Sequence, residues 1–409
     1  MPVQLTRRRA LAGLLSTAVW PSAAVARADD SAASFATWVD SFERKARARS
    51  IPAATYRRVM AAIKPDTSVY ALDKAQPEFR EALWQYLNRR VSDWRITIGQ
   101  EKAREHADLL ERIERDYGID RYAMLGLWGM ESAFGEVVLN PKHMRPVLPA
   151  LAALAWGEPR RRSYWEKELL NALVIIERGW AKPDEMIGSW AGAMGHTQWM
   201  PEVWLNMGVD YNKDGRISPY GSPDDALAGT ARFIQKRGRY RRGEAWGYEV
   251  KGAGAQASEG QKMVPVSEWA GRGVVRADGK PFPRAEERAR LWIPAAGGPA
   301  FLLTRNFYAI RSYNPASSYA LAIVHLGDRI RGEGPFHRQF RGGERALTLP
   351  EVQEIQQRLT ARGLDTGGTD GRVGRDTMRA VRAFQQKEGL LPADGYPGLK
   401  VLARLRGKS

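Results

Sequence analysis

The chain has 409 residues and a formal net charge of +17, from 63 Lys and Arg against 46 Asp and Glu. That length is enough for two or three domains with substantial cores. The absence of cysteine excludes disulfides, thiolate catalysis, thiolate metal sites and a cysteine-linked lipid anchor. The charge suits a polyanionic partner such as nucleic acid, an anionic membrane surface or a cell wall, but a basic soluble surface without such a partner explains it equally well.

Residues 1–28 are typical of an export signal. Arg7, Arg8 and Arg9 precede an apolar run over Ala10–Trp20, and small residues at 24–28 offer cleavage sites. The arginines also resemble a twin-arginine signal, so the sequence leaves the Sec and Tat routes open. A frayed basic terminus or a single anchor helix is the alternative. The run is too short to span a bilayer comfortably, so we expect an exported protein that is soluble outside the cytoplasm.

Helical periodicity dominates residues 34–236. Apolar side chains recur at steps of three and four over Glu101–Tyr117, which predicts a helix that Gly118 ends. The same pattern predicts helices over Tyr122–Met130, Leu148–Trp156, Tyr164–Arg178, Ala226–Lys236 and Tyr319–Arg331.

The region Lys251–Pro299 differs, since it is rich in Gly, Ala and Pro. Arg290–Ile293 and Ala300–Thr304 flank a Gly-rich turn and predict a β-hairpin. A Gly- and Arg-rich stretch after Gly332 predicts a linker. Leu347–Leu405 then shows three short amphipathic patterns, which predict a three-helix module.

The segment Gly126–Gly135 contains the best candidate for chemistry. On a helix, Leu127, Trp128 and Phe134 would lie at i−4, i−3 and i+3 from Glu131 and flank its carboxyl with apolar groups. Desolvation would raise the pKa of that carboxyl and suit it to general acid catalysis near neutral pH. The alternative is an ordinary glutamate at a helix end that points into water.

A second segment, Ser189–Pro201, combines small residues with Gln198 and tryptophans. The small residues allow close approach to a ligand, Gln198 suits hydroxyl or acetamido groups, and Trp190, Trp199 and Trp204 would stack on sugars. A tight helix crossing with core tryptophans explains the segment equally well. His196 is more consistent with a polar wall than with a metal ligand, because no second histidine lies at ligand spacing.

A third segment reads as the first half of a calcium loop. Asp210, Asn212 and Asp214 provide side-chain oxygens, and Arg216 would contribute its backbone carbonyl. The usual closing glutamate is missing, and Asp224 or Asp225 would replace it. A turn rich in Asp and Asn without any metal is the alternative.

The first two segments, together with Tyr313–Ala322, resemble the MltB-type family of lytic murein transglycosylases. Gly126–Gly135 fits the family pattern G-[IL]-W-G-x-E-[ST]-x-[FY]-G, and Ser189–Pro201 fits S-[WY]-A-G-A-M-G-x-x-Q-[FW]-M-P. The third block resembles Y-N-x-S-x-x-Y-A. The resemblance spans about residues 35–331 and implies a lysozyme-like helical fold with Glu131 at the base of a sugar-binding groove.

The resemblance also implies roles for matching positions. Glu131 would be the sole acid/base, and the family's loop favours Asp225 as the closing ligand of a structural Ca²⁺; no other cofactor is required. The positions implied to bind substrate are, beside Glu131, Ser189, Met194 and Gln198 and, over the scissile bond, Tyr313, Asn314 and Tyr319.

The C-terminal module resembles a small peptidoglycan-binding module. The match includes Asp370-Gly371-Arg372-Val373-Gly374 and Asp394-Gly395, whose Asp-Gly pairs make tight turns. It implies tethering to the wall, which raises the local substrate concentration. A helical accessory module with another partner is the alternative. We therefore expect a mainly α chain: a signal peptide (1–28), a lysozyme-like catalytic domain with a small β-containing insertion (34–332), a linker (333–346) and a C-terminal three-helix module (347–407).

A single strong carboxylate favours lytic transglycosylation, since ordinary glycosidases use two. The resemblance implies cleavage of the β-1,4 bond between MurNAc and GlcNAc, attack by the MurNAc 6-hydroxyl, and a 1,6-anhydro product released in the periplasm. The expected partners are peptidoglycan strands and, as candidates, other cell-wall synthesis or remodelling enzymes. A hydrolytic muramidase and a non-catalytic wall-binding protein are the alternatives, and the export signal opposes a nucleic-acid binder.

Overall fold

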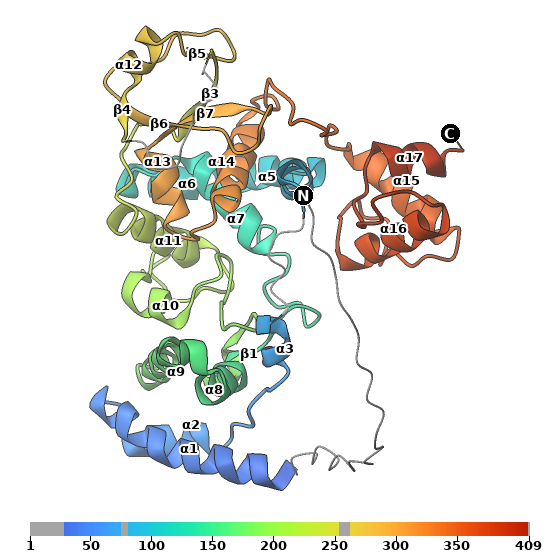
Figure 1. Ribbon diagram of the computed structural model, residues 1–409. Coiled ribbons are helices and arrows are strands. Elements are labelled where there is room, and N and C mark those ends of the chain that lie inside the picture. Colours follow the sequence, from blue (N-terminus) through green and yellow to red (C-terminus); the bar gives the residue numbers. More distant parts are fainter. Residues whose placement is uncertain (1–27, 75–80, 253–261, 408–409) are drawn as a thin grey trace, which may run out of the picture.

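The computed structural model describes residues 28–74, 81–252 and 262–407. The predicted export signal therefore lies almost entirely outside the described residues. Within them, every helix is too short or too polar to cross a membrane. The described chain is mainly helical, with a two-stranded sheet, a five-stranded sheet and a C-terminal helical module (Figure 1).

One layer of helices builds the part of the body that lies lowest in Figure 1, and its core includes Phe42, Tyr56, Leu151 and Leu169. Its central pair, α8 and α9, pack directly on each other. The elements of this part are α1 (Ala28–Ala48), α2 (Ala53–Met60), α3 (Val69–Lys74), β1 (Arg145–Pro146), α8 (Val147–Gly157), η1 (Pro159–Arg161), α9 (Arg162–Glu177), η2 (Pro183–Glu185), β2 (Ile187–Gly188) and α10 (Pro201–Met207). Strands β1 and β2 pair antiparallel.

A second group of helices forms the middle of the body. It comprises α4 (Leu83–Arg90), α5 (Asp93–Glu105), α6 (Ala107–Tyr117), α7 (Arg121–Ser132), α11 (Asp224–Lys236), α13 (Arg305–Arg311) and α14 (Ser317–Arg331). The single helix expected over Glu101–Tyr117 is wrong, because His106 leaves helical geometry at φ −111° and ψ 27° and divides it into α5 and α6. The histidine ring packs edge-on against Trp128 instead. Gly118 ends α6 in the left-handed conformation, as predicted.

The crossing of α7 and α14 fixes the geometry of the middle layer. A Cβ on Gly126 would lie 2.1 Å from the carbonyl oxygen of Ile323, and a Cβ on Gly327 would lie 2.5 Å from that of Tyr122. Only glycine permits backbones to approach so closely. Since Gly126 faces Ile323 and Gly327 faces Tyr122, the helices run antiparallel, and the C-terminal end of α7 lies opposite the first turn of α14.

A five-stranded antiparallel sheet lies at the top of the body in Figure 1, with strand order β4-β6-β7-β3-β5. It comprises β3 (Gly247–Lys251), β4 (Val264–Pro265), α12 (Val266–Gly271), β5 (Val275–Arg276), β6 (Arg288–Trp292) and β7 (Ala300–Thr304). The predicted hairpin is present as β6 and β7, with Arg290 opposite Leu303. The insertion is wider than expected, because its strand β3 begins before Lys251, at Gly247.

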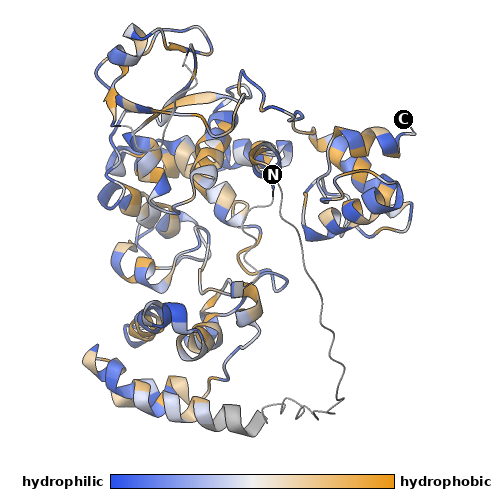
Figure 2. Cartoon of the chain, in the orientation of Figure 1, coloured by the Kyte–Doolittle hydropathy of each residue, from blue (hydrophilic) through white to orange (hydrophobic). Residues whose placement is uncertain are grey.

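The C-terminal module consists of α15 (Leu349–Thr360), α16 (Arg375–Lys387) and α17 (Leu399–Leu405), around a core that includes Ile355, Val381, Phe384 and Leu402. Figure 2 shows both hydrophobic and hydrophilic residues on each of these helices. The predicted fold class, a helical catalytic domain with a β-containing insertion and a three-helix module, is confirmed.

The predicted linker after α14 is docked on the body. The carboxylate of Glu249 on β3 accepts hydrogen bonds from the backbone amides of His337 and Arg338, at 2.7 and 2.8 Å. The ring of Phe336 stacks on that of His325, with 3.8 Å between centroids. These contacts fix the direction in which the chain leaves the body toward the module.

Candidate active site

Glu131 lies in the last turn of α7. The helix ends at Ser132 because Ala133 and Phe134 adopt left-handed conformations, with φ of 52° and 60°. The expected position of Phe134 at i+3 on the helix is therefore wrong. Leu127 and Trp128 are fully buried in the core, so they form the floor beneath this turn rather than an open wall.

Among the described residues, the carboxyl of Glu131 has one side-chain hydrogen-bond partner. The hydroxyl of Tyr319, in the first turn of α14, donates to Oε1 of Glu131. Burial raises the pKa of Glu131 to about 7, although the Tyr319 hydrogen bond and the positive charge of Arg90 act in the opposite direction. A carboxyl with that pKa is substantially protonated near neutral pH and also ionises readily. A group that first donates a proton as a general acid and then accepts one as a general base needs both properties.

The two motif segments meet directly below Glu131. The Ser132 hydroxyl donates to the backbone oxygen of His196 at 2.6 Å and accepts from the amide of Gly135 at 2.9 Å. The Trp128 indole donates to Nδ1 of His196 at 3.2 Å, and Nε2 of His196 lies 2.8 Å from the oxygen of Gly221. These partners require the neutral imidazole with its proton on Nε2, and burial lowers the pKa of His196. His196 thus holds the two segments together.

A cavity of about 970 Å³ opens above Glu131. Three residues implied by the resemblance, Gln198, Asn314 and Tyr319, line it together with Glu131. Gln198 has φ 53°, and its amide nitrogen donates to the backbone oxygen of Gly195 at 3.0 Å, which holds the side chain at the wall. The tertiary structure therefore brings together residues from three distant segments.

The other three substrate-binding candidates lie outside this lining. The hydroxyl of Ser189 accepts from the amide of Ala193 at 3.1 Å and so closes a tight turn. Met194 is fully buried in the core. The hydroxyl of Tyr313 donates to the backbone oxygen of Thr197 at 2.5 Å. These three side chains support the loops of the site in this structure, and a direct contact with sugar remains a prediction.

The idea that three tryptophans stack on sugars is wrong for two of them. Trp199 is fully buried, and its indole nitrogen donates to Thr230 Oγ1 at 2.8 Å. Trp204 is 1% exposed and donates to the oxygen of Ile217 at 2.9 Å. Only Trp190 of the three is partly exposed. The alternative of core tryptophans is the correct one for Trp199 and Trp204.

Sequence reasoning missed the wall that α4 contributes. Tyr86, Arg89 and Arg90 line the cavity, on a helix that packs against α14. Arg95 is half-buried and donates to the backbone oxygens of Arg89 and Arg90 at 3.4 and 3.3 Å and to that of Gly129 at 3.0 Å. It thereby ties the end of α4 to the turn of α7 that carries Glu131. No motif marks α4, and only the tertiary arrangement places it here.

Two other carboxylates line the described cavity, and both are engaged. Glu81 forms a two-pronged pair with Arg89, at 2.6 and 3.0 Å. Asp394, from the C-terminal module, accepts from Gln85 at 2.7 Å and from Gln385 at 3.1 Å. Among the described lining residues, Glu131 is therefore the carboxyl that is placed to exchange a proton with a ligand.

The predicted calcium loop forms a compact turn. Asp210 accepts from the amides of Asp214 and Gly215, at 3.1 and 3.0 Å. Asp225, buried at the start of α11, accepts from the amides of Tyr211 and Ser218 on both limbs of the loop, at 2.7 and 2.9 Å. The described residues include no converged group of three or more acidic, histidine or cysteine side chains.

The remaining loop candidates differ in their fit to a metal. Asp224 accepts from Ser222 at 2.5 Å and lies 3.7 Å from Arg112, so Asp225 is the carboxylate that joins the loop. Asn212 and Asp214 direct side-chain oxygens at loop amides, whereas the Arg216 side chain pairs with Glu185 at 3.5 Å. The donors are all oxygen, which is the ligand type that Ca²⁺ prefers.

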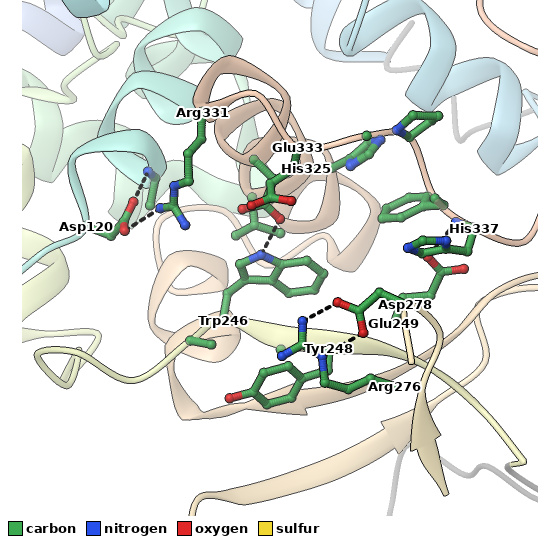
Figure 3. A pocket seen from close by; sticks show the side chains of 18 of the residues that line it. Asp120, Trp246, Tyr248, Glu249, Arg276, Asp278, His325, Arg331, Glu333 and His337 are labelled. Atoms are coloured by element: carbon green, nitrogen blue, oxygen red, sulfur yellow. Dashed lines mark hydrogen bonds and ion pairs between the residues drawn. The ribbon is translucent and has the colours of Figure 1, made fainter. Parts of the chain in front are cut away.

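A second cavity, of about 540 Å³, lies between the sheet, α14 and the linker (Figure 3). The Trp246 indole donates to Oδ2 of Asp328 at 2.8 Å, and burial raises the pKa of Asp328 to about 7. Arg331 pairs with Asp120, and Arg276 pairs with Asp278. Its charged groups are thus largely paired with one another, and Glu131 is not part of its lining.

Comparison with known proteins identifies the family. Residues 34–328 match the transglycosylase SLT domain family, and residues 348–405 match the putative peptidoglycan binding domain family. The chain belongs to the transglycosylase SLT domain family. The prediction of an MltB-type lytic transglycosylase with a C-terminal peptidoglycan-binding module is confirmed.

Several individual proteins resemble this transglycosylase. The crystal structure of SltB3 from Pseudomonas aeruginosa in complex with NAG-anhNAM-pentapeptide is 39% identical, has a TM-score of 0.70, and the match covers 91% of this chain and 99% of that one. Membrane-bound lytic murein transglycosylase B of Escherichia coli K12 is 27% identical over 276 residues, which is 67% of this chain and 73% of that protein. The structure of Escherichia coli Slt35 in complex with calcium, 24% identical with a TM-score of 0.61, shares the fold.

Proposed function

We propose that this transglycosylase cleaves the β-1,4 bond between MurNAc and GlcNAc in peptidoglycan and forms a 1,6-anhydroMurNAc end, for cell-wall remodelling or turnover. The observation that carries the proposal is the half-buried Glu131 carboxyl, with a pKa of about 7, facing a large cavity whose other described carboxylates are already paired or hydrogen-bonded. The 39% identical SltB3, whose structure contains NAG-anhNAM-pentapeptide, supports the same product here.

The chemistry uses one carboxyl twice. Protonated Glu131 gives its proton to the glycosidic oxygen as the bond to the anomeric carbon breaks. The resulting carboxylate then takes the proton from the 6-hydroxyl of the same MurNAc, whose oxygen attacks the anomeric carbon. The attacking group is already attached to the sugar, so proximity favours closure over attack by water. The Tyr319 hydroxyl stabilises the intermediate carboxylate through its hydrogen bond to Oε1.

Digestion of purified sacculi tests this function. The full-length protein and its Glu131→Gln variant would be incubated with sacculi, and the released fragments analysed by mass. We expect fragments that are lighter by one water than hydrolytic muropeptides from the first, and almost none from the second. Fragments of full hydrolytic mass would identify a muramidase instead, and binding without release by both proteins would identify a non-catalytic wall-binding protein.

We further propose that the loop around Asp210 binds a structural Ca²⁺. The support is the oxygen-only donor set and the buried carboxylate of Asp225, whose pKa is raised by burial and further by the charge of Asp210. A bound cation would stabilise both carboxylates. Calcium would then raise the melting temperature of the wild type but not of Asp225→Ala, and an equal rise in both would contradict the proposal.

The site of action that we propose is the periplasm. The basic and apolar pattern of residues 1–28 and the wall-acting relatives support export. Fractionation of a bacterium that expresses the full chain would place the processed protein in the periplasm. Retention in the cytoplasm would contradict this location without affecting the chemistry.

A further inference from the structure

The C-terminal module contributes part of the wall of the catalytic cavity. Met378 and Arg382 of α16, and Asp394, Tyr396 and Pro397 of the loop before α17, line the same cavity as Glu131. A module that only tethered the enzyme to the wall would not need to line the cavity that contains Glu131.

Direct hydrogen bonds hold the module against α4 and the start of α5. The Gln85 amide donates to Asp394 at 2.7 Å, and the Asn88 amide donates to the Tyr396 hydroxyl at 3.0 Å. The ring of Tyr396 packs edge-on against Trp84, with 5.0 Å between centroids. On the α15 side, the amide of Leu349 donates to Asp93 at 2.9 Å. Together with the docked linker, these contacts give the module a defined position at the cavity.

Two arginines at this seam have no carboxylate partner among the described residues. Arg90 on α4 has its guanidinium 5.7 Å from the centre of the Tyr86 ring, and its buried Nε has no hydrogen-bond acceptor. Arg382 on α16 is exposed and donates one hydrogen bond, to the backbone oxygen of Asp394 at 3.0 Å. Both retain donors for a ligand, whereas neighbouring Arg89 is already paired with Glu81.

The charge balance of the cavity favours an anion. Apart from Glu131, the described lining has three arginines against two carboxylates, Glu81 and Asp394, so one positive charge is in excess while Glu131 is protonated. Glu81 pairs with Arg89, and the Asp394 carboxylate keeps its charge but both of its oxygens accept hydrogen bonds from side-chain amides. Arg90 and Arg382 are therefore the charged groups left to bind a ligand beside Glu131. Arginine presents two parallel N–H groups that match a carboxylate.

We propose that Arg90 and Arg382 form a carboxylate-binding subsite at the seam between the catalytic body and the C-terminal module. The inference rests on the proposed function, since it assumes that the glycan strand occupies this cavity. The carboxylate has two possible sources in peptidoglycan: the lactyl group of a MurNAc that lacks its peptide, or the stem peptide of a substituted MurNAc. In either case the module binds substrate at the reacting bond as well as at a distance.

The test compares KM values of the full-length protein on three substrates. The first is peptide-bearing glycan strands. The second is strands whose peptides have been removed, so that the lactyl carboxylates are free. The third is a neutral control, in which all carboxylates of such strands have been converted to amides. Arg382→Gln removes the charge at the seam. Arg379→Gln is the matched control, because Arg379 lies on the same helix, is exposed, pairs with Asp376 at 2.9 Å and does not line the cavity.

We expect Arg382→Gln to raise KM about fivefold to tenfold on at least one carboxylate-bearing substrate, with kcat nearly unchanged. A hydrogen bond to a charged group at an exposed site contributes about that factor to substrate affinity. On the amidated strands the variant and the wild type should have equal KM values. Arg382→Lys should recover part of the loss, and Arg379→Gln should match the wild type throughout.

The outcomes separate the possibilities. A KM effect confined to peptide-bearing strands identifies the stem peptide, and one confined to bare strands identifies the lactyl group. An equal KM rise on neutral strands, or no rise on any substrate, overturns the subsite. Wild-type protein that releases no anhydro ends from any substrate would instead overturn the proposed function.

Discussion

Tyr319 on α14 donates its hydroxyl to the carboxyl of Glu131 on α7, across the closest helix crossing in the middle of the body. The two residues are 188 positions apart in the chain. Gly126 and Gly327 allow the backbones to approach, and the antiparallel register then brings the start of α14 to the end of α7. The position of the Glu131 carboxyl relative to its hydrogen-bond donor thus depends on one packing interface.

The pH dependence of cleavage should report Glu131. Its pKa of about 7 lies above the ordinary glutamate value of 4.5, so the carboxyl is protonated over a wider pH range. Because the proposed mechanism begins with the protonated form, kcat/KM should fall as the pH rises through about 7. A pH–rate profile on soluble glycan strands measures this, and a decline centred near pH 4.5 would contradict the raised pKa.

Replacing Tyr319 by Phe should slow cleavage and shift this decline. The hydroxyl lowers the pKa of Glu131, so its removal should raise that pKa and move the alkaline limb to higher pH. Loss of stabilisation of the carboxylate should reduce kcat about tenfold. Tyr122→Phe is the control, since Tyr122 lies at the other end of the same helix pair. An unchanged profile in Tyr319→Phe would show that the contact has no role.

Widening the α7–α14 crossing should impair both stability and catalysis. In Gly327→Ala the new Cβ would meet the Tyr122 oxygen at 2.5 Å, so the helices must separate. We expect a loss of about 1–3 kcal/mol in the free energy of unfolding and a larger fractional loss in kcat than in KM. Gly271→Ala on α12, where nothing lies within 4 Å, should be neutral or slightly stabilising. Equal melting temperatures for the two variants would refute the close packing.

His196 should contribute stability that depends on pH. Its folded pKa is lowered, so the unfolded chain binds a proton first, and stability is present above about pH 6.5 and lost as the pH falls. His196→Leu leaves the buried Trp128 indole without an acceptor, which should cost about 1–3 kcal/mol at neutral pH. Melting curves from pH 5 to 8 should show a smaller difference between wild type and variant at the acidic end.

Asp328→Asn should stabilise the protein at alkaline pH. The folded pKa of Asp328, about 7, exceeds the ordinary aspartate value of 3.8, so the native state retains the proton while the unfolded chain loses it. Stability therefore falls as the pH rises from about 4 to 7, by on the order of 2–4 kcal/mol. Asparagine still accepts from Trp246 and does not ionise. The variant should melt higher than wild type at pH 8 and close to it at pH 4, and the reverse order would exclude a buried, protonated Asp328.

Much of the local structure could be predicted from the sequence. Apolar spacing placed the helices around Tyr122–Met130 and Tyr319–Arg331, and a Gly-rich turn between two apolar runs predicted the β6–β7 hairpin. Glu131 stood out because its neighbours are apolar, and its raised pKa agrees with that reasoning. These features depend on residues close in the chain, where periodicity and turn chemistry act directly.

Only the tertiary structure decided which side chains surround Glu131. The sequence suggested Phe134, but left-handed backbone at Ala133 and Phe134 ends α7 before that position, and Tyr319 and α4 occupy the place instead. The sequence could not show whether Trp199 stacks on a sugar or packs in the core, because a tryptophan presents the same apolar face in both roles. Its burial in the structure decides for the core. Contacts between segments more than a hundred residues apart follow from helix packing and interdomain hydrogen bonds, and no local pattern encodes these.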